Sequence, residues 1–267
     1  MAVVVRRGPE LLAKRGLALL DEAGELFVTL LEGLRRTWDL KTWWGEFIEQ
    51  AWFIIRVTSI PLLLIAIPLG ATISLQVGDV ARQIGAQSST GALVVAGMVR
   101  QIAPLASALL ISGAGGSAIT SDMGARRIRD ELSALEVMGI NPTHRLVTPR
   151  LWAAAVVSVL LCSLVILSGT AGGFYFNVIQ QGVTPGAYFD GAASLLQLSD
   201  LGITLFKAFV FGLVAAAVAC HMGMTCDYGP AGVGRAVTRA TVATSLLVFF
   251  LNYVLETLYL VLVPPKI

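Results

Sequence analysis

The sequence predicts an all-α membrane protein with an amino-terminal interfacial amphipathic helix, five transmembrane helices, and a short cytoplasmic helix between spans two and three. Three observations support this fold class. The 267 residues are 56% hydrophobic and only 13% charged, about half the charged fraction of a typical soluble domain. The mean hydropathy is +0.78. Apolar stretches of about 20 residues, each long enough to cross a bilayer core as a helix, recur along the chain.

The amino-terminal part differs from the rest, and we expect a cytoplasmic, interfacial unit at residues 1–50 ahead of a five-span domain at 51–267. From Pro9 to Arg36, apolar and charged side chains alternate in an amphipathic helical pattern that is too charged to cross a membrane. A soluble regulatory helix is the alternative. Tryptophan is enriched at the headgroup level of membranes, and four tryptophans mark the expected turn into the first span: Trp38, Trp43, Trp44 and Trp52.

The apolar stretches place five spans in order along the chain. They cover about 57–78, 91–113, 151–176, 202–224 and 241–263. Lysine and arginine gather in the segments before span one, between spans two and three, and between spans four and five. The positive-inside rule therefore predicts a cytoplasmic amino terminus and, after an odd number of spans, a carboxyl terminus outside.

Three ionisable residues lie within or near the predicted spans: Arg100, Lys207 and Glu256. A charge at the bilayer centre costs about 2.5 to 3.5 kcal/mol on insertion scales, so such groups usually face a cavity or a partner. We expect Lys207 to extend its amine to the outer interface. Two interpretations of Arg100 stay open on the residues alone: it lines a pocket for a lipid headgroup or carboxylate, or it pairs with Glu256.

Other motifs indicate packing rather than chemistry. Gly169 and Gly173 form a GxxxG pattern, which predicts closely packed helices or dimerisation. No phosphate-binding GxxxxGK[ST] loop, HExxH or GxSxG occurs, so we expect neither catalysis nor a nucleotide or metal bound by this chain. The net charge of +2 gives no reason to expect nucleic acid. Three cysteines beside a histidine fit no zinc spacing and are predicted to be small buried side chains: Cys162, Cys220 and Cys226, with His221.

The stretch DELSALEVMGINP, residues 130–142, is a charged amphipathic segment between spans two and three. We expect a helix over residues 128–138, ended by Gly139 and prevented from continuing by Pro142. Its apolar side is predicted to carry Leu132, Leu135 and Val137 or Met138. Two roles stay open: the helix covers the bundle, or it docks in a groove on a partner.

Two long segments resemble the MlaE/YrbE permeases, the membrane subunits of ABC transporters that work with MCE proteins. They are GSAITSDMGARRIRDELSALEVMGINPTHRLVTPRLWA, residues 116–153, and GPAGVGRAVTRATV, residues 229–242. The resemblance covers roughly residues 45–263. The tryptophan-rich WDLKTWWGEF, residues 38–47, looks most like the actinobacterial (mycobacterial) YrbE A-type paralogue.

The resemblance implies that the helix between spans two and three is a coupling helix, seated in a groove of a separate cytoplasmic ABC ATPase that binds ATP and Mg²⁺. The residues expected at that contact are Asp130, Glu131, Leu132, Leu135, Glu136, Met138 and Gly139. Cytoplasmic support is expected from Arg126, Arg235 and Arg239.

The resemblance further implies a second YrbE-type permease, a paralogue in the actinobacterial systems, and MCE proteins that form a periplasmic lipid tunnel. The expected function is the ATP-driven import of fatty acids or related lipids across the bacterial plasma (inner) membrane. The alternative on the residues is an ion-coupled secondary lipid transporter that uses Arg100 and Glu256 without an ATPase. An intramembrane lipid-modifying enzyme is a further rival, against which the lack of a catalytic constellation argues.

The chain departs from the family pattern at the positions that could line a lipid cavity. The family often has Arg-Glu-Leu-Gly-Pro in span two, where this chain has Arg100 and Gln101, and an aspartate in the last span, where this chain has Asn252. Glu256 is an added acidic group. A different cargo would explain these changes, and so would divided labour with a non-identical partner. The cavity candidates are Arg100, Gln101, Asn252 and Glu256.

Overall fold

The computed structural model describes residues 24–33, 35, 40–85 and 90–262, and all the regular secondary structure in them is helical. Residues 24–33 form a helix of their own. The elements that follow are α2 (Leu40–Gln83), α3 (Thr90–Gly97), η3 (Met98–Ile102), α4 (Ala103–Leu110), η4 (Ile111–Gly115), α5 (Gly116–Ile128), α6 (Glu131–Val137), η5 (Thr143–Val147), α7 (Thr148–Tyr175), η6 (Phe176–Gln180), α8 (Pro185–Leu195), α9 (Leu198–Met224) and α10 (Pro230–Leu262).

Five helical stretches are long and apolar enough to cross a membrane, which confirms the predicted span count and order. They are Trp43–Gln83, Thr90–Ile128, Thr143–Gln180, Leu198–Met224 and Pro230–Leu262. Each is longer than predicted because the helix continues past its apolar core into a polar end. The second and third are not uniform α-helices. The second passes through the π-helical turns η3 and η4, and the third begins and ends in η5 and η6.

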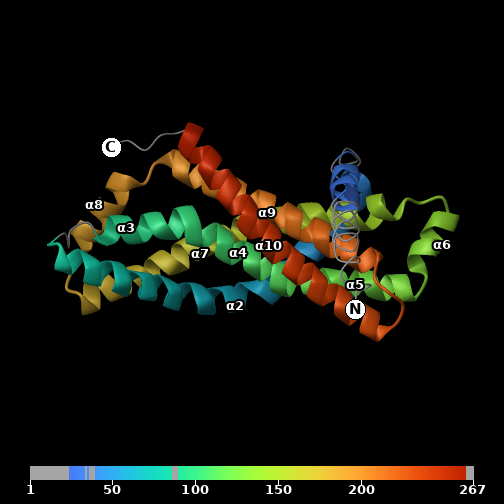
Figure 1. Ribbon diagram of the computed structural model, residues 1–267, viewed down its shortest axis with the longest axis horizontal. Helices are drawn as coiled ribbons and strands as arrows, with labels where there is room; N and C mark the ends of the chain where they lie inside the picture. The colour runs from blue at the N-terminus through green and yellow to red at the C-terminus, as the bar shows by residue number, and fades with distance from the viewer. Residues whose placement is uncertain (1–23, 34, 36–39, 86–89, 263–267) are drawn as a thin grey trace, which may run out of the picture.

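The spans run along the long axis of the molecule, with α6 at one end and α8 at the other (Figure 1). These ends are called the α6 end and the α8 end below. The helix of residues 24–33 lies across the long axis near the α6 end, as the blue segment of Figure 1 shows. It packs through Leu30 onto the core and brings Glu25 within 3.7 Å of His221. The rest of the helix predicted from Pro9 to Arg36 falls almost entirely outside the described residues.

The tryptophans predicted to lie at the interface differ in their exposure. Trp44 and Trp52 are exposed, at 52% and 66%. Trp43 is buried at 3%, and its ring contacts Phe47 edge-on at the base of α2. Its indole therefore contributes to packing within the protein. Trp38 lies outside the described residues.

Helices α2 and α7 pack closely along their length through glycines, as the GxxxG pattern predicts. A Cβ on Gly70 of α2 would lie 1.9 Å from the carbonyl oxygen of Gly169, and one on Gly172 would lie 2.3 Å from that of Ile67. No larger residue fits these positions without moving a backbone. α9 packs against α7 on one side and against α5 and α10 on the other. It is the most buried of the five spans.

Candidate functional site

The segment between α5 and α7 forms the predicted short helix, but a sharp turn separates it from α5. The prediction of one helix over residues 128–138 is wrong in its first part, because α5 ends at Ile128 and α6 begins at Glu131. Asp130 between them has a φ of 56°, a left-handed conformation that a helix does not tolerate. The turn redirects α6 away from the axis of α5 (Figure 1).

The carboxyl-terminal half of α6 presents an apolar surface outward. Gly139, with a φ of 74°, ends the helix as predicted. Leu132 and Leu135 pack against the core. Val137 and Met138, predicted on the same side, instead point away from it and are 88% and 63% exposed. The apolar residues here therefore divide into an inner pair that holds the helix to the bundle and an outer pair that the described part of the chain leaves exposed.

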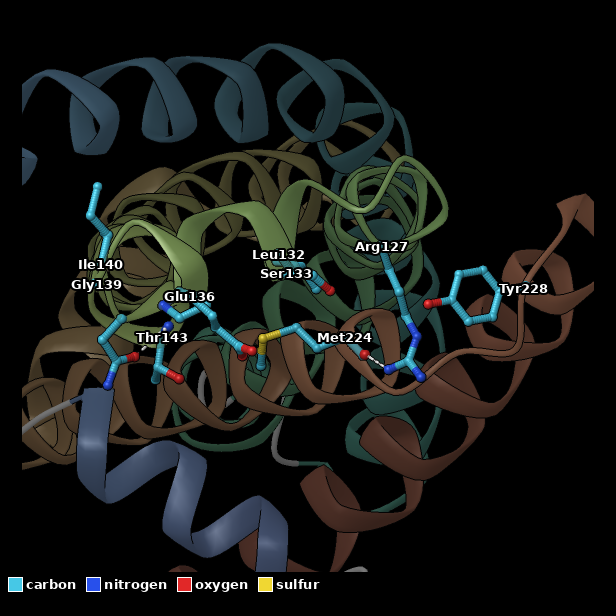
Figure 2. Close-up of a pocket in the computed structure, with 11 residues that line it drawn as sticks. Arg127, Leu132, Ser133, Glu136, Gly139, Ile140, Thr143, Met224 and Tyr228 are labelled. Carbon is cyan, nitrogen blue, oxygen red and sulfur yellow. Dashed lines mark hydrogen bonds between the residues drawn. The ribbon is translucent and has the colours of Figure 1, made fainter.

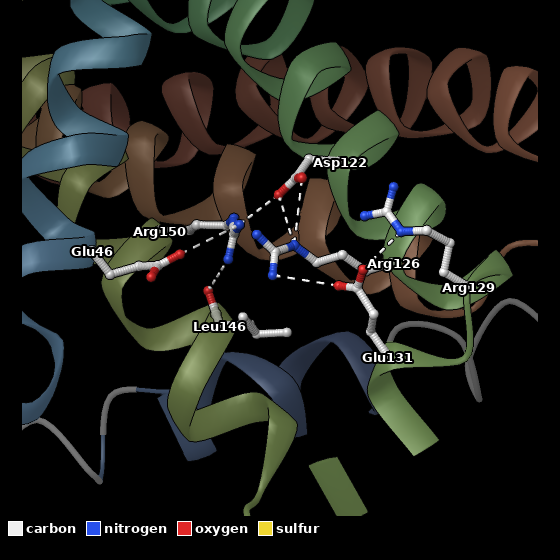
Figure 3. A network of polar contacts seen from close by, with 7 residues as sticks. All are labelled: Glu46, Asp122, Arg126, Arg129, Glu131, Leu146 and Arg150. Atoms are coloured by element: carbon white, nitrogen blue, oxygen red, sulfur yellow. Dashed lines mark hydrogen bonds and ion pairs between the residues drawn. The ribbon is translucent and has the colours of Figure 1, made fainter. Parts of the chain in front are cut away.

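A fully buried arginine anchors the region beneath α6. Arg150, near the start of α7, is 0% exposed and donates from Nη2 to Asp122 of α5 over 2.5 Å (Figure 3). Its Nη1 donates to the carbonyl of Leu146 over 2.7 Å, and Glu46 of α2 lies 3.9 Å away. A buried guanidinium needs such partners, because an uncompensated charge is costly. One side chain thus joins α2, α5 and α7.

Further ion pairs extend this cluster to α6 (Figure 3). Arg126 lies 3.3 Å from the Asp122 carboxylate and 3.7 Å from Glu131, which is the first residue of α6. Arg129 donates to the same Glu131 over 2.7 Å. The structure therefore places the predicted residues Arg126 and Glu131 in one continuous network. We call Glu46, Asp122, Arg126, Arg129, Glu131 and Arg150 the α6 network.

On its other side, α6 borders a cavity of about 620 Å³ that reaches the turn between α9 and α10 (Figure 2). Glu136 and Gly139, both predicted site residues, line it. Arg127 donates to the carbonyl of Met224 and lies over the ring of Tyr228, 5.7 Å from its centre. The Tyr228 hydroxyl in turn donates to Asp130 over 3.3 Å. These contacts hold the α9–α10 turn beside α6.

The other two predicted supporting arginines lie apart from α6. Arg235 donates to Asp227 over 2.9 Å, and this hydrogen bond holds the pKa of the Asp227 carboxyl below its usual value. Arg235 and Arg239 line a small cavity of about 180 Å³ that also borders Glu25 and His221. The structure thus separates them from Arg126, with which they were grouped.

Of the two interpretations of Arg100, pairing with Glu256 is wrong, and lining a pocket stays a prediction. Arg100 does not pair with Glu256; it donates to Asp200 of α9 over 2.9 Å. Asp200 is 1% exposed and also accepts from the Tyr259 hydroxyl over 2.6 Å and from the Gln197 backbone N–H over 3.0 Å. The hydrogen bond from the Gln197 N–H caps the amino terminus of α9. The Asp200 carboxylate therefore both caps this helix and neutralises Arg100. The side chain of Arg100 remains 34% exposed.

Lys207 does not extend to the interface. It is 1% exposed and forms an ion pair with Glu256 of α10. One turn away, the Asn252 amide donates to the Gln101 side chain over 3.2 Å. All four cavity candidates therefore lie where η3, α9 and α10 meet, each bonded to a neighbouring span. Together they attach α10 to the bundle.

Sequence reasoning missed Asp122, Arg150 and Asp200 as site residues. Arg150 carried a signal, because it is the last charge before a long uncharged stretch and therefore marks the polar end of a span. Asp200 carried a weaker one, as an acid three residues after a polar residue at a helix start. Among the described residues, no group of three or more histidine, cysteine, aspartate or glutamate side chains could hold a metal ion. The three cysteines are buried and unpaired, as predicted.

Comparison with known proteins places the chain in a family. The model of the family described as "Permease MlaE" matches residues 47–258. The chain is 31% identical to a probable ABC transporter permease protein of Synechocystis over 71% of its length and 72% of that protein's. It is 30% identical to the intermembrane phospholipid transport system permease protein MlaE of Haemophilus influenzae, covering 77% of this chain and 79% of that one. The chain therefore belongs to the MlaE permease family and is a multi-pass membrane permease subunit rather than an enzyme.

Proposed function

We propose that this chain is the membrane-spanning permease of an ABC-type lipid transporter, and that a separate ATPase, which binds ATP and Mg²⁺, drives it by docking on α6. The observation that carries the proposal is the outward apolar surface of α6. Val137 and Met138 are exposed at the tip of a helix whose base is fixed by the α6 network. Exposed apolar side chains on a short helix suit a groove on a partner.

The α6 network supplies a rigid connection from such a docking point to the spans. A displacement of α6 would be transmitted to α5 through the ion pair of Glu131 with Arg126. From α5 it would be transmitted to α7 and α2 through the contacts of Arg150 with Asp122 and Glu46. A helix held only by apolar contacts could slide under load, whereas directed ion pairs resist a change in register. This arrangement supports transmission of movement rather than simple covering of the bundle.

Replacement of Val137 by aspartate tests the docking. Burying an apolar side chain contributes about 1.5 to 3 kcal/mol, so the variant should bind the ATPase about tenfold or more weakly. The measurement is the amount of ATPase that co-purifies with the tagged chain from membranes. Val137→Leu keeps the apolar surface and should retain the ATPase. Leu135→Asp is less informative, because Leu135 packs against the core. Full retention of the ATPase by Val137→Asp would refute the proposal.

We also propose that the α6 end is cytoplasmic and that the carboxyl-terminal end of α10, which lies at the α8 end (Figure 1), faces outside. The supporting observation is that the arginines of the α6 network, with Arg235 and Arg239, gather at one end. A membrane-impermeant maleimide should label Ala193→Cys, exposed on α8, in intact cells. It should label Val137→Cys only after the cells are opened. The native cysteines are buried, so they give little background. The reverse pattern would invert the topology.

A second permease, proposed to be a paralogue, would cover the outer face of α10. Four large side chains on one stripe of this helix are 65% to 75% exposed: Leu246, Phe250, Tyr253 and Val261. We assign the chain to the actinobacterial A-type, with MCE proteins completing a lipid tunnel outside the membrane. Mass spectrometry of the purified complex tests this directly. A second, non-identical YrbE-type chain and MCE proteins support it, whereas two copies of this chain alone would contradict it.

The proposed cargo is fatty acids or related lipids, moved inward. The guanidinium of Arg100 is paired with Asp200 but remains 34% exposed, so it can donate a further hydrogen bond to a lipid carboxylate, and its neighbours Gln101 and Asn252 are neutral rather than acidic. Uptake of labelled fatty acid and of labelled phospholipid, compared in cells with and without the transporter, tests both cargo and direction. Loss of phospholipid uptake alone would overturn the fatty-acid assignment. Transport that survives ATP depletion but stops with an ionophore would instead indicate the ion-coupled alternative.

A further inference from the structure

A second large cavity, of about 590 Å³, opens at the α8 end between α3, η3, α7, α8 and the start of α9. Its fourteen lining residues include no aspartate, glutamate, lysine, arginine or histidine. Three of them, Thr170, Gln197 and Tyr188, carry side-chain oxygen or nitrogen atoms. The volume falls within the range of roughly 300 to 1,000 Å³ that is usual for small-molecule sites. The cavity is therefore of ligand size and suited to an apolar ligand.

The cavity has a closed floor and an open mouth. Val95, Val99 and Tyr188 form the floor and are only 2% to 6% exposed. Leu167 and Leu198 stand at the mouth, at 69% and 90% exposed. The hydroxyl of Tyr188 already donates to the carbonyl of Thr170 over 3.3 Å, so the floor presents no unsatisfied donor to a ligand. A polar ligand would lose its hydrogen bonds with water here and gain few in return.

The walls of the cavity belong to the parts of the spans nearest the α8 end. Val99 is the ninth residue after α3 begins at Thr90, Ile166 is the ninth before α7 ends at Tyr175, and Leu201 lies in the first turn of α9. Ten helical residues rise about 15 Å, which is half of a hydrocarbon core about 30 Å thick. The third span continues through η6 to Gln180, so the lining residues lie within the half of each span nearest the α8 end.

We propose that this cavity holds one unbranched acyl chain taken from the leaflet at the α8 end. An apolar hollow that opens sideways from a membrane span faces hydrocarbon, and an acyl chain fills it at little cost. A transmembrane helix of a partner is a poorer occupant, because it would run along the full length of the spans, whereas the lining residues lie only in the parts nearest the α8 end. The cavity is lined by Val99, the neighbour of Arg100 on η3, but none of the paired charges Arg100, Asp200, Lys207 and Glu256 lines it. It requires a bilayer around the chain and not the ATPase docking proposed above, so either idea can fail alone.

Photolabelling in a bilayer tests the site. The full-length chain is reconstituted in nanodiscs of phosphatidylethanolamine and phosphatidylglycerol without ATP. One arm contains a trace of phosphatidylcholine with a diazirine at the end of one acyl chain, and the other contains a diazirine fatty acid. After irradiation, labelled peptides are mapped by mass spectrometry. We expect label to concentrate on the cavity-lining parts of α7 and α8 rather than on Leu160, a lipid-exposed residue of α7 outside the cavity.

A matched pair of variants on α8 separates the cavity from the general lipid surface. Ala192 lines the cavity, whereas its neighbour Ala193 is exposed outside it. Ala192→Phe should lower labelling of the cavity about tenfold by filling it, and Ala193→Phe should leave it unchanged. If Ala192→Phe does not fold, Ala171→Trp fills the cavity from the α7 wall. Preferential labelling of the cavity by either probe supports the site. The probe that labels it more strongly shows whether the acyl chain comes from a phospholipid or from a free fatty acid. Equal labelling of the cavity and Leu160 in the wild type would overturn it.

Discussion

The ion pairs of the α6 network and the ion pairs within the spans differ in the number of partners of each charge and in burial. In the α6 network the acids Asp122 and Glu131 each contact two cations, and they are 42% and 40% exposed. Within the spans the cations are paired singly, Arg100 with Asp200 and Lys207 with Glu256, and Asp200 and Lys207 are each 1% exposed. The two acids at the α6 end therefore have a second cation and access to water, whereas each pair within the spans has one ionic partner and one side chain that is almost fully buried. Loss of one partner should therefore be tolerated at the α6 end and damaging within the spans.

The largest effect is expected for Glu256→Gln. It leaves the buried ammonium of Lys207 without its partner, which costs about 3 to 5 kcal/mol in buried pairs. Thermal unfolding of the purified protein in detergent, or its yield in membranes, measures the loss. The double variant Lys207→Met with Glu256→Gln should recover most of it, because no charge then remains. A single variant as stable as the wild type would show that water reaches Lys207.

A somewhat smaller effect is expected for Asp200→Asn. The variant loses the partner of Arg100 and weakens the hydrogen bonds from Tyr259 and Gln197, but Arg100 is partly exposed and can be solvated. We expect a loss of about 2 to 3 kcal/mol, as for a hydrogen bond to a charged group. Tyr259→Phe removes only one neutral donor and serves as the matched control. The comparison of the two melting temperatures is the measurement, and equal shifts would contradict a dominant role for the ion pair.

At the α6 end, Arg150→Met should cost less stability than either change within the spans. Asp122 keeps Arg126 as a partner and has access to solvent, so we expect a loss of about 1 to 2 kcal/mol. The link from α6 to α7 is cut, however, so the ATPase should still bind while its activity no longer responds to lipid. Co-purification and ATPase assays on the same sample test both halves. Loss of binding would show that Arg150 shapes the docking surface itself.

The smallest effect is expected at the exposed pair of Arg235 and Asp227. Arg235 lowers the pKa of Asp227, so the pair stabilises the fold above the ordinary carboxylate pKa, and that contribution is lost as pH falls through the lowered value. Both side chains are more than half exposed, and solvent screens the interaction. Arg235→Gln should leave the melting temperature at neutral pH unchanged within error. A clear shift would give this pair a structural role that its exposure does not suggest.

The sequence predicts the five spans well because uncharged stretches of membrane length have few alternative folds. It also predicts the end of α6, since Gly139 followed by Pro142 leaves the helix little freedom. It does not predict the turn at Asp130, where tertiary contacts impose a left-handed conformation on a residue that a helix accepts. Nor does it predict pairing: Arg100 lies 100 residues from Asp200, and composition alone gives no reason to prefer that partner to Glu256.

The π-helical turn η3 has a consequence for the whole second span. A π-turn accommodates one residue more than an α-helical turn, and each residue of an α-helix rotates the side-chain direction by about 100°. Deletion of one residue between Met98 and Ile102 could restore a regular α-helix locally. The side chains of α4 and α5 would then be rotated about the helix axis by a quarter-turn or more and would lose their present neighbours. The directions of Asp122 and Arg126 thus depend on the extra residues of both π-helical turns, η3 beside Arg100 and η4 at Ile111–Gly115.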